Sequence, residues 1–372
     1  ILWIGTMDGL LRFDPERGVL RQYTHDPADQ NTISSNHITS ILRDSRGALW
    51  IGTSGGGLNR LDGKTGRFTH FVHRPDDPSS LSADSVMCLL EDSGGILWIG
   101  TWNGGVNRMD RETGTFSTPA AYQGMKITSL LEDRERNLWI GAWANGLFYL
   151  DPRRERPVQF IHDSAQPRSL SSGTITCLCE DRSGMIWSGT IGGGINVCHR
   201  QIDRFVNYSR SLLNPNSLSA DIVYSLLEDR EGTLWAGTYE GGLNRLDRQR
   251  EVFTRYDLPG VSTQEKRLNT VLALREDRRG VLWAGTYGQG LMRFDPQTGI
   301  FHTLPGSEAN TSRYGENIVR AIVEDRDGFL WYGTDETGLH KMDADGHPVA
   351  AYAPVENSTN CLSDNYVTCI LP

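Results

Sequence analysis

Four aromatic side chains occupy the same place after a repeated string, Leu/Ile-Trp-x-Gly-Thr/Ala, at one position per copy. They are Trp102, Trp143, Tyr239 and Tyr287. Aromatic rings stack on the apolar faces of sugars, and Trp and Tyr dominate binding hot spots. Because a repeated scaffold does not dictate this position, we interpret the four rings as candidate ligand-binding residues. The alternative is that they pack against a neighbouring loop.

A second set of candidates is polar and stands where each predicted first strand begins. Its candidate binding residues are Asp84, Asp221, Asn269 and Asn317. Such side chains either bind ligand hydroxyls around a channel mouth or satisfy backbone groups of the turn.

Two further residues, Tyr224 and Arg320, stand out three positions into their strands, where other copies have Thr or an apolar residue. The planar fork of Arg320 suits the carboxylate of a sugar, or it pairs with a local acid such as Asp221.

Catalytic chemistry has weaker support. A glycosidase needs two carboxylates at a fixed separation, and no spacing singles out two among Asp84, Asp221 and Asp335. The chain has neither a G-x-S-x-G elbow nor an H-E-x-x-H motif. We therefore predict no catalytic residue, no metal site and no cofactor. Six cysteines without C-x-x-C spacing argue against a zinc site, and Cys361 is the one to test for a disulfide.

Composition excludes two classes of partner. A formal net charge of −9 argues against nucleic-acid binding, which needs a basic face. No apolar run approaches the roughly 18 residues of a membrane span, and no signal-peptide leader is visible. Since the chain begins with Ile1, we interpret it as a piece of a longer protein.

The candidates are positioned by a repeat. Its tryptophans lie at positions 3, 50, 98, 139, 187, 235, 283 and 331, mostly 48 residues apart. Within residues 36–72, four short segments, in which apolar and polar residues alternate, are separated by Gly-rich turns. Four antiparallel strands per copy predict the blade of an all-β propeller with nearly no helix.

The two ends of the chain supply complementary halves of one blade. Residues 1–6 read as a second strand without a first, and residues 365–372 read as a first strand without a second. We predict one domain, residues 1–372, with eight four-stranded blades, closed by pairing the C-terminal strand with the N-terminal blade. The alternative is seven blades plus an extra repeat.

One connection is shorter than the others. Between Phe116 and Asp133 there are seven residues fewer than between Phe68 and Asp92. The missing residues belong to the loop between the copies that carry Trp102 and Trp143. A trimmed loop predicts a notch beside both rings.

Two stretches carry a family resemblance: SLSADSVMCLLEDSGGILWIGTWNGGVNRMD, ending at Asp110, and SLSADIVYSLLEDREGTLWAGTYEGGLNRLD, ending at Asp247. They resemble the two-component regulator propeller repeat, found in periplasmic sensor regions of bacterial hybrid two-component systems. The resemblance implies an extracytoplasmic or periplasmic sensor that recognises a carbohydrate fragment and signals through downstream domains of its parent protein. This chain shows no β-sandwich and no kinase motif, and relatives commonly use rings of seven.

The leading interpretation is a non-catalytic recognition propeller with an oligosaccharide ligand. The alternatives are a carbohydrate-active enzyme, either a polysaccharide lyase or a glycoside hydrolase, and a pure protein-interaction platform. A homodimer is a further partnership that the sequence leaves open.

Overall fold

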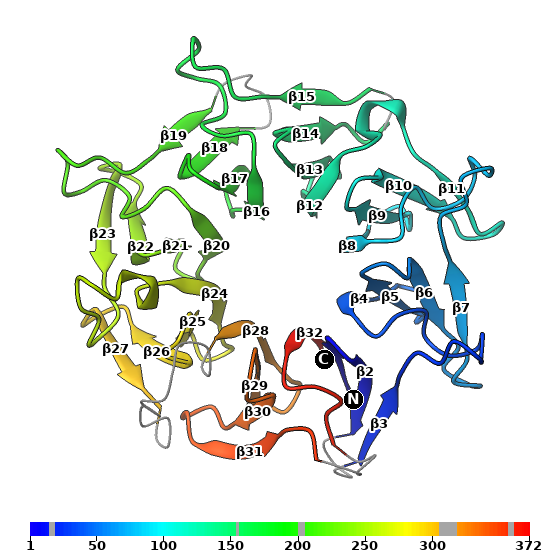
Figure 1. Ribbon diagram of the computed structural model, residues 1–372. Helices are drawn as coiled ribbons and strands as arrows, with labels where there is room; N and C mark the ends of the chain where they lie inside the picture. The colour runs from blue at the N-terminus through cyan, green and yellow to red at the C-terminus, as the bar shows by residue number, and fades with distance from the viewer. Residues whose placement is uncertain (15–18, 154–155, 200–204, 305–317, 356–360) are drawn as a thin grey trace.

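The chain forms a ring of small β-sheets around a central axis (Figure 1). This computed structural model describes residues 1–14, 19–153, 156–199, 205–304, 318–355 and 361–372. Among them are 32 strands and two short 3-10 turns, η1 (Ala120–Tyr122) and η2 (Lys266–Leu268). The described residues contain no α-helix, as the absence of a 3.6-residue apolar period predicts.

Each blade is a meander of four strands that runs from the axis outward. The innermost strands are β4 (Ile38–Arg43), β8 (Val86–Glu91), β12 (Lys126–Glu132), β16 (Ile175–Glu180), β20 (Val223–Glu228), β24 (Val271–Glu276), β28 (Val319–Glu324) and β32 (Val367–Leu371). The second strands are β5 (Leu49–Thr53), β9 (Leu97–Thr101), β13 (Leu138–Trp143), β17 (Met185–Thr190), β21 (Leu234–Thr238), β25 (Leu282–Thr286), β29 (Leu330–Thr334) and β1 (Leu2–Thr6). The third strands are β6 (Leu58–Leu61), β10 (Gly105–Asp110), β14 (Leu147–Leu150), β18 (Ile195–His199), β22 (Gly242–Asp247), β26 (Leu291–Asp295), β30 (Leu339–Met342) and β2 (Gly9–Asp14). The outermost strands are β7 (Phe68–Phe71), β11 (Thr115–Ser117), β15 (Val158–Phe160), β19 (Val206–Tyr208), β23 (Val252–Tyr256), β27 (Ile300–Thr303), β31 (Pro348–Tyr352) and β3 (Val19–Tyr23).

The eighth blade combines the two ends of the chain. Its strand order is β3-β2-β1-β32, and Ile4 pairs with Ile370 in an antiparallel ladder. The eight-blade prediction and its closure are therefore confirmed, and the alternative of seven blades plus an extra repeat is wrong. In Figure 1 the N and C termini lie together inside this blade.

The repeated Trp is locked by a side chain of its own blade. In seven blades the Asp that ends the innermost strand accepts a hydrogen bond of 2.7–2.9 Å from the indole Nε1 six residues later. The other carboxylate oxygen of Asp44 accepts the amides of Arg46 and Ala48, which closes the turn. A single buried carboxylate thus joins the turn to the large ring that fills the space between blades.

The repeated Gly has a separate cause in the contact between blades. A Cβ added to Gly52 would lie 2.6 Å from Cγ1 of Val86, which belongs to the next blade. Equivalent clashes occur at Gly100 and Gly237, with Ile127 and Val271. Glycine is therefore required for the close approach of adjacent sheets.

The long loops between blades share one brace. The ring Nδ1 of His73 lies 2.7 Å from the carbonyl of Leu81, and His25 and His162 repeat this contact with their own loops. Leu81 itself is fully buried between two blades. These three histidines thus hold their loops in place, which accounts for them without a catalytic role.

The trimmed connection replaces such a loop by η1. Its Tyr122 is fully buried and packs with Trp98, Val106 and Phe148, where described connections use an aliphatic residue such as Leu81 or Leu170. Within the described residues, no helix is long and apolar enough to cross a membrane.

Candidate ligand-recognition site

Every innermost strand contains a β-bulge at the same residue. The ladder to the second strand slips by one at Thr39, Met87, Thr128, Thr176, Tyr224, Leu272, Arg320 and Thr368. A bulged residue is left out of the pairing, and its side chain is re-aimed relative to its neighbours. The bulge explains why this position stands out in the sequence as chemically variable.

The bulged residues differ in what they contact. In Thr39, Thr128 and Thr176 the hydroxyl donates to a backbone carbonyl of the next blade, at 2.5–2.8 Å. Three consecutive blades have instead Tyr224, Leu272 and Arg320, and the first and last of these are exposed. Met87, which is 36% exposed, is a fourth large residue at this position, in the blade of Trp102. Three of the four large side chains are therefore presented by neighbouring blades.

Around these bulges lies a cluster that we name the tyrosine sector, comprising Tyr224, Tyr239, Tyr287, Arg267 and Arg320. The rings of Tyr224 and Tyr239 meet edge to face with centroids 6.2 Å apart. The Arg267 guanidinium lies 5.7 Å from the centroid of Tyr287 and hydrogen-bonds with Tyr239. Burial, reinforced by Tyr239, raises the pKa of Tyr224, while Arg320 opposes the shift. All five residues therefore share one environment.

Arg320 is held by an acid, as one of the two interpretations expected, but the acid is different. Its Nε and a terminal nitrogen donate to Asp335 at 2.9 and 3.1 Å. The pair forms because the bulge of β28 places Arg320 beside the residue that follows β29. Asp221 is not the partner, since its Oδ1 accepts the backbone amide of Arg210 at 2.6 Å.

A cavity of about 480 Å³ adjoins the tyrosine sector. Tyr239, Asp221 and Asn269 line it together with Lys266 and Glu240. Three of the residues predicted from sequence are thus brought together in one hollow, between the loop that precedes β20 and the loop that precedes β24.

The polar residues at the strand entries have clear structural partners. Oδ1 of Asp84 accepts the amide of His73 at 2.7 Å, and Oδ1 of Asn269 accepts the amide of Leu258 at 2.8 Å. Asp221 repeats the same contact. These side chains close their loops, as the turn-capping interpretation expected, and ligand contact stays a prediction for them. Asn317 lies outside the described residues.

The second aromatic cluster, the tryptophan pair, consists of Trp102 and Trp143. Their ring centroids are 5.8 Å apart with planes inclined by 60°. Nζ of Lys126 lies 4.7 Å from the centroid of Trp102, a cation–π contact. Trp143 is 41% exposed, whereas the eight scaffold tryptophans are at most 6% exposed. Trp143 is therefore open to solvent and Trp102 is half-buried, and the notch beside them stays a prediction.

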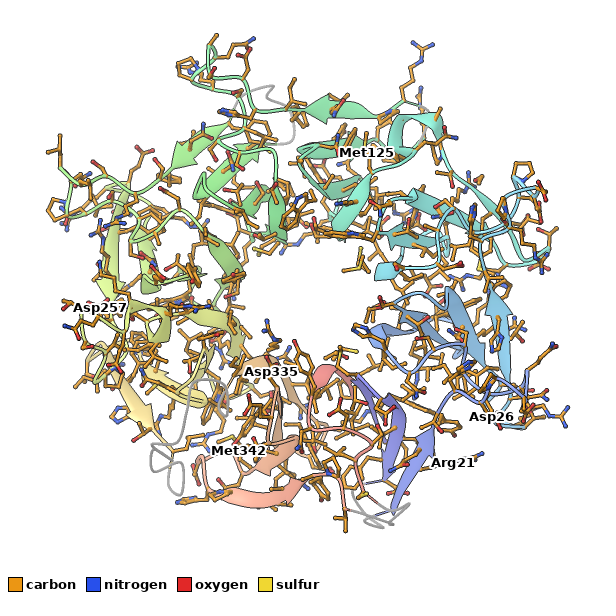
Figure 2. The ribbon with its side chains drawn as sticks, in the orientation of Figure 1. Arg21, Asp26, Met125, Asp257, Asp335 and Met342 are labelled. Atoms are coloured by element: carbon orange, nitrogen blue, oxygen red, sulfur yellow. The ribbon has the colours of Figure 1, made fainter. Side chains whose placement is uncertain are left out.

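The two aromatic clusters stand on opposite sides of the ring. The tryptophan pair belongs to the blades of β8 and β12, and the tyrosine sector to those of β20, β24 and β28. Figure 2 labels Met125, which precedes Lys126, and Asp335 across the ring centre from it. The predicted aromatic set is therefore two groups with different basic partners.

Sequence reasoning did not single out Lys126, Arg267 or the role of Asp335. Arg267 lies in the loop DLPGVSTQEKRLN, which lacks the His-x-Pro of the loops that contain His25 and His73. That departure was the available signal.

Among the described residues, no group of three or more His, Cys, Asp or Glu side chains could hold a metal ion. All six cysteines are described, and none forms a disulfide. Cys361 is buried, and its Sγ accepts the amide of Val355 at 3.2 Å.

Fold and site together define an eight-bladed β-propeller whose variable side chains gather where the innermost strands begin. The model of the "Two component regulator propeller" family matches seven segments, residues 32–55, 80–103, 121–144, 169–192, 217–240, 266–288 and 314–336. The chain therefore belongs to the two component regulator propeller family. A comparison with curated proteins finds no match.

Solved structures give similar folds at low identity. The extracellular domain of BT4673 from B. thetaiotaomicron, named as a one component system, is 20% identical with a TM-score of 0.39. That of BT3049, named as a hybrid two component system of the same organism, is 22% identical with a TM-score of 0.38. This chain is covered to 96% and 94%, but it spans only 60% and 56% of those chains.

Two shorter structures superpose better. The computationally designed Ika8 protein is 15% identical, with a TM-score of 0.59 and 87% of both chains covered. Virginiamycin B lyase from Staphylococcus aureus is 14% identical, with a TM-score of 0.54, covering 80% of this chain and 92% of that chain. At these identities the likeness concerns the fold alone.

Proposed function

We propose that this propeller is the extracytoplasmic recognition part of a signalling protein and binds an oligosaccharide at the mouth of its ring. The observation that carries the proposal is the placement of two aromatic clusters, each with one exposed ring, Trp143 or Tyr224, beside half-buried ones. They occupy positions that the scaffold leaves free, in a chain of the two component regulator propeller family. Binding would be passed to downstream domains of the parent protein, and the chain itself would perform no chemistry.

Each aromatic cluster offers what a sugar needs. Rings such as Trp143 and Tyr224 present apolar faces, while Lys126 and Arg267 supply donors for hydroxyl oxygens. The cavity beside Tyr239 adds Asp221 and Asn269, which would bind hydroxyls with whatever capacity their loop contacts leave.

A glycan array probed with the purified chain tests the proposal, followed by titration calorimetry with each hit. We expect the double variant Trp102→Ala/Trp143→Ala, or Tyr224→Ala/Tyr239→Ala, to lose at least tenfold in affinity. The matched control Tyr332→Phe changes an aromatic residue outside both clusters and should bind as the unmodified chain does. No binding to any glycan, or release of shortened products during incubation, would contradict the proposal, the latter in favour of an enzyme.

A further inference from the structure

The loop between β23 and β24 brings one arginine to the tyrosine sector. Arg267 lies in η2, and the preceding residues 257–265 do not follow the pattern of the other long loops. Because the loop is peculiar to one blade, Arg267 has no equivalent that the repeat would require for packing. Its presence needs a reason that lies outside the scaffold.

The guanidinium lies among aromatic rings. It stacks over Tyr287 with 5.7 Å to the ring centroid. The Tyr239 hydroxyl, then Tyr287 and more weakly Glu240, raise its pKa. Within the described residues no carboxylate lies at ion-pair distance from it. The side chain is exposed, so its remaining donors face solvent.

Arg320, in the same sector, shows the opposite arrangement. Its fork is occupied by both oxygens of Asp335, and its charge is thereby balanced. The two arginines therefore differ in what they offer a ligand. Arg320 offers the edge of a neutral pair, whereas Arg267 offers a guanidinium that no described carboxylate holds in an ion pair, although Glu240 acts on it from further away.

We infer that Arg267 holds an anionic group of the ligand, a carboxylate or a sulfate, at the tyrosine sector. The inference rests on the proposed function in so far as that ligand is a glycan. A guanidinium binds such oxygens through two parallel N–H donors, and prior stacking reduces the conformational entropy lost on binding. Arg320 then acts as a positioning residue, because Asp335 holds its fork while its guanidinium lies 6.0 Å from the ring centroid of Tyr366 and its charge acts on Tyr224.

The first test detects the anion without reference to any glycan. The protein is titrated with sodium glucuronate and, separately, sodium sulfate at constant ionic strength, and the Nε–Hε resonances of its arginines are followed by NMR. We expect a saturable change at Arg267 in at least one titration, and no saturable change at Arg320 or at Arg250, which lies in a turn at the other end of a blade. Absence of a change at Arg267 with both salts overturns the inference.

The second test uses the glycan array with variants. Arg267→Gln should reduce binding to carboxylated or sulfated glycans at least tenfold and leave neutral glycans within twofold. Arg250→Gln removes the same charge elsewhere and should change neither group. Anionic glycans bound equally by Arg267→Gln, or exclusive binding of neutral glycans, would overturn the inference while the proposed function stands. A saturable NMR change with no glycan bound would refute the proposed function and leave the inference standing.

Discussion

The indole rings of Trp102 and Trp143 lie 5.8 Å apart at the ring mouth, although they belong to different blades. They are the only two of ten tryptophans outside the scaffold position. The other eight are at most 6% exposed, and seven of them donate Nε1 to a buried Asp. Tryptophan emission therefore contains a signal that belongs to one site.

Acrylamide quenching should separate this signal from the rest. We expect a small accessible fraction of the emission, contributed by Trp143 and to a lesser degree by Trp102, because a quencher reaches only exposed rings. Trp143→Phe should remove most of that fraction, while Tyr287→Phe on the other side of the ring should leave it unchanged. An accessible fraction that persists in Trp102→Phe/Trp143→Phe would show that a scaffold tryptophan is open to solvent.

The hydrogen bonds that the buried Asp accepts from the repeated Trp and from the turn should contribute strongly to the stability of a blade. Asp229 accepts Nε1 of Trp235 at 2.7 Å and the amides of Glu231 and Thr233 at 3.0 and 2.8 Å. Asp229→Ala leaves three donors unpaired near a buried ring, which should cost about 2–4 kcal/mol of unfolding free energy in urea. The control Asp247→Ala, in an outer turn of the same blade, should cost less than about 1 kcal/mol. Equal losses of unfolding free energy in the two variants would show that the hydrogen bonds of Asp229 add no special stability.

The fold was predictable from sequence because one string returns eight times at nearly constant spacing, and its two incomplete copies complement each other. The site was predictable only in part. Tyr224 and Arg320 were visible as departures from a Thr position, but the bulge that aims them depends on strand pairing. The Arg320–Asp335 pair links residues fifteen apart. Arg267 contacts Tyr239 and Tyr287 from a different loop. Contacts between loops do not follow the repeat, so periodicity could not reveal them.

A half-buried histidine should make stability depend on pH. His340 stacks on Tyr332 with centroids 4.8 Å apart, and its Nε2 lies 2.9 Å from Oγ1 of Thr337. Burial lowers the pKa of His340 below its ordinary value, which is about 6.5 in an unfolded chain. As pH falls through that value, the unfolded chain takes up a proton that the folded chain does not, so stability decreases.

The variant His340→Asn installs the residue that other blades have at this position, such as Asn59 and Asn244. Urea midpoints at pH 7.5 and pH 5.5 should differ less in this variant than in the unmodified chain. His302→Asn, which alters an exposed histidine of the neighbouring blade, serves as the control and should retain the full pH effect. An unchanged pH effect in His340→Asn would show that His340 does not cause the loss of stability at low pH.

Backbone strain accompanies the tryptophan pair. The residue after Trp143 is Ala144, exposed and at φ 65°, and the equivalent residue in the next blade is Gly192 at φ 84°. A left-handed conformation costs a non-glycine residue about 1–2 kcal/mol, partly offset by the greater freedom of glycine in the unfolded chain. Ala144→Gly should therefore raise the unfolding free energy by about 0.5–1 kcal/mol.

The reciprocal change Gly192→Ala should lower it by a similar amount, since nothing lies within 4 Å of the added Cβ. If the strain serves to hold Trp143, Ala144→Gly should also weaken ligand binding while it stabilises the fold. Such strain is typical of recognition sites, where the surrounding structure fixes an unfavourable conformation. A stabilised Ala144→Gly variant with unchanged affinity would show that the strain has no part in recognition.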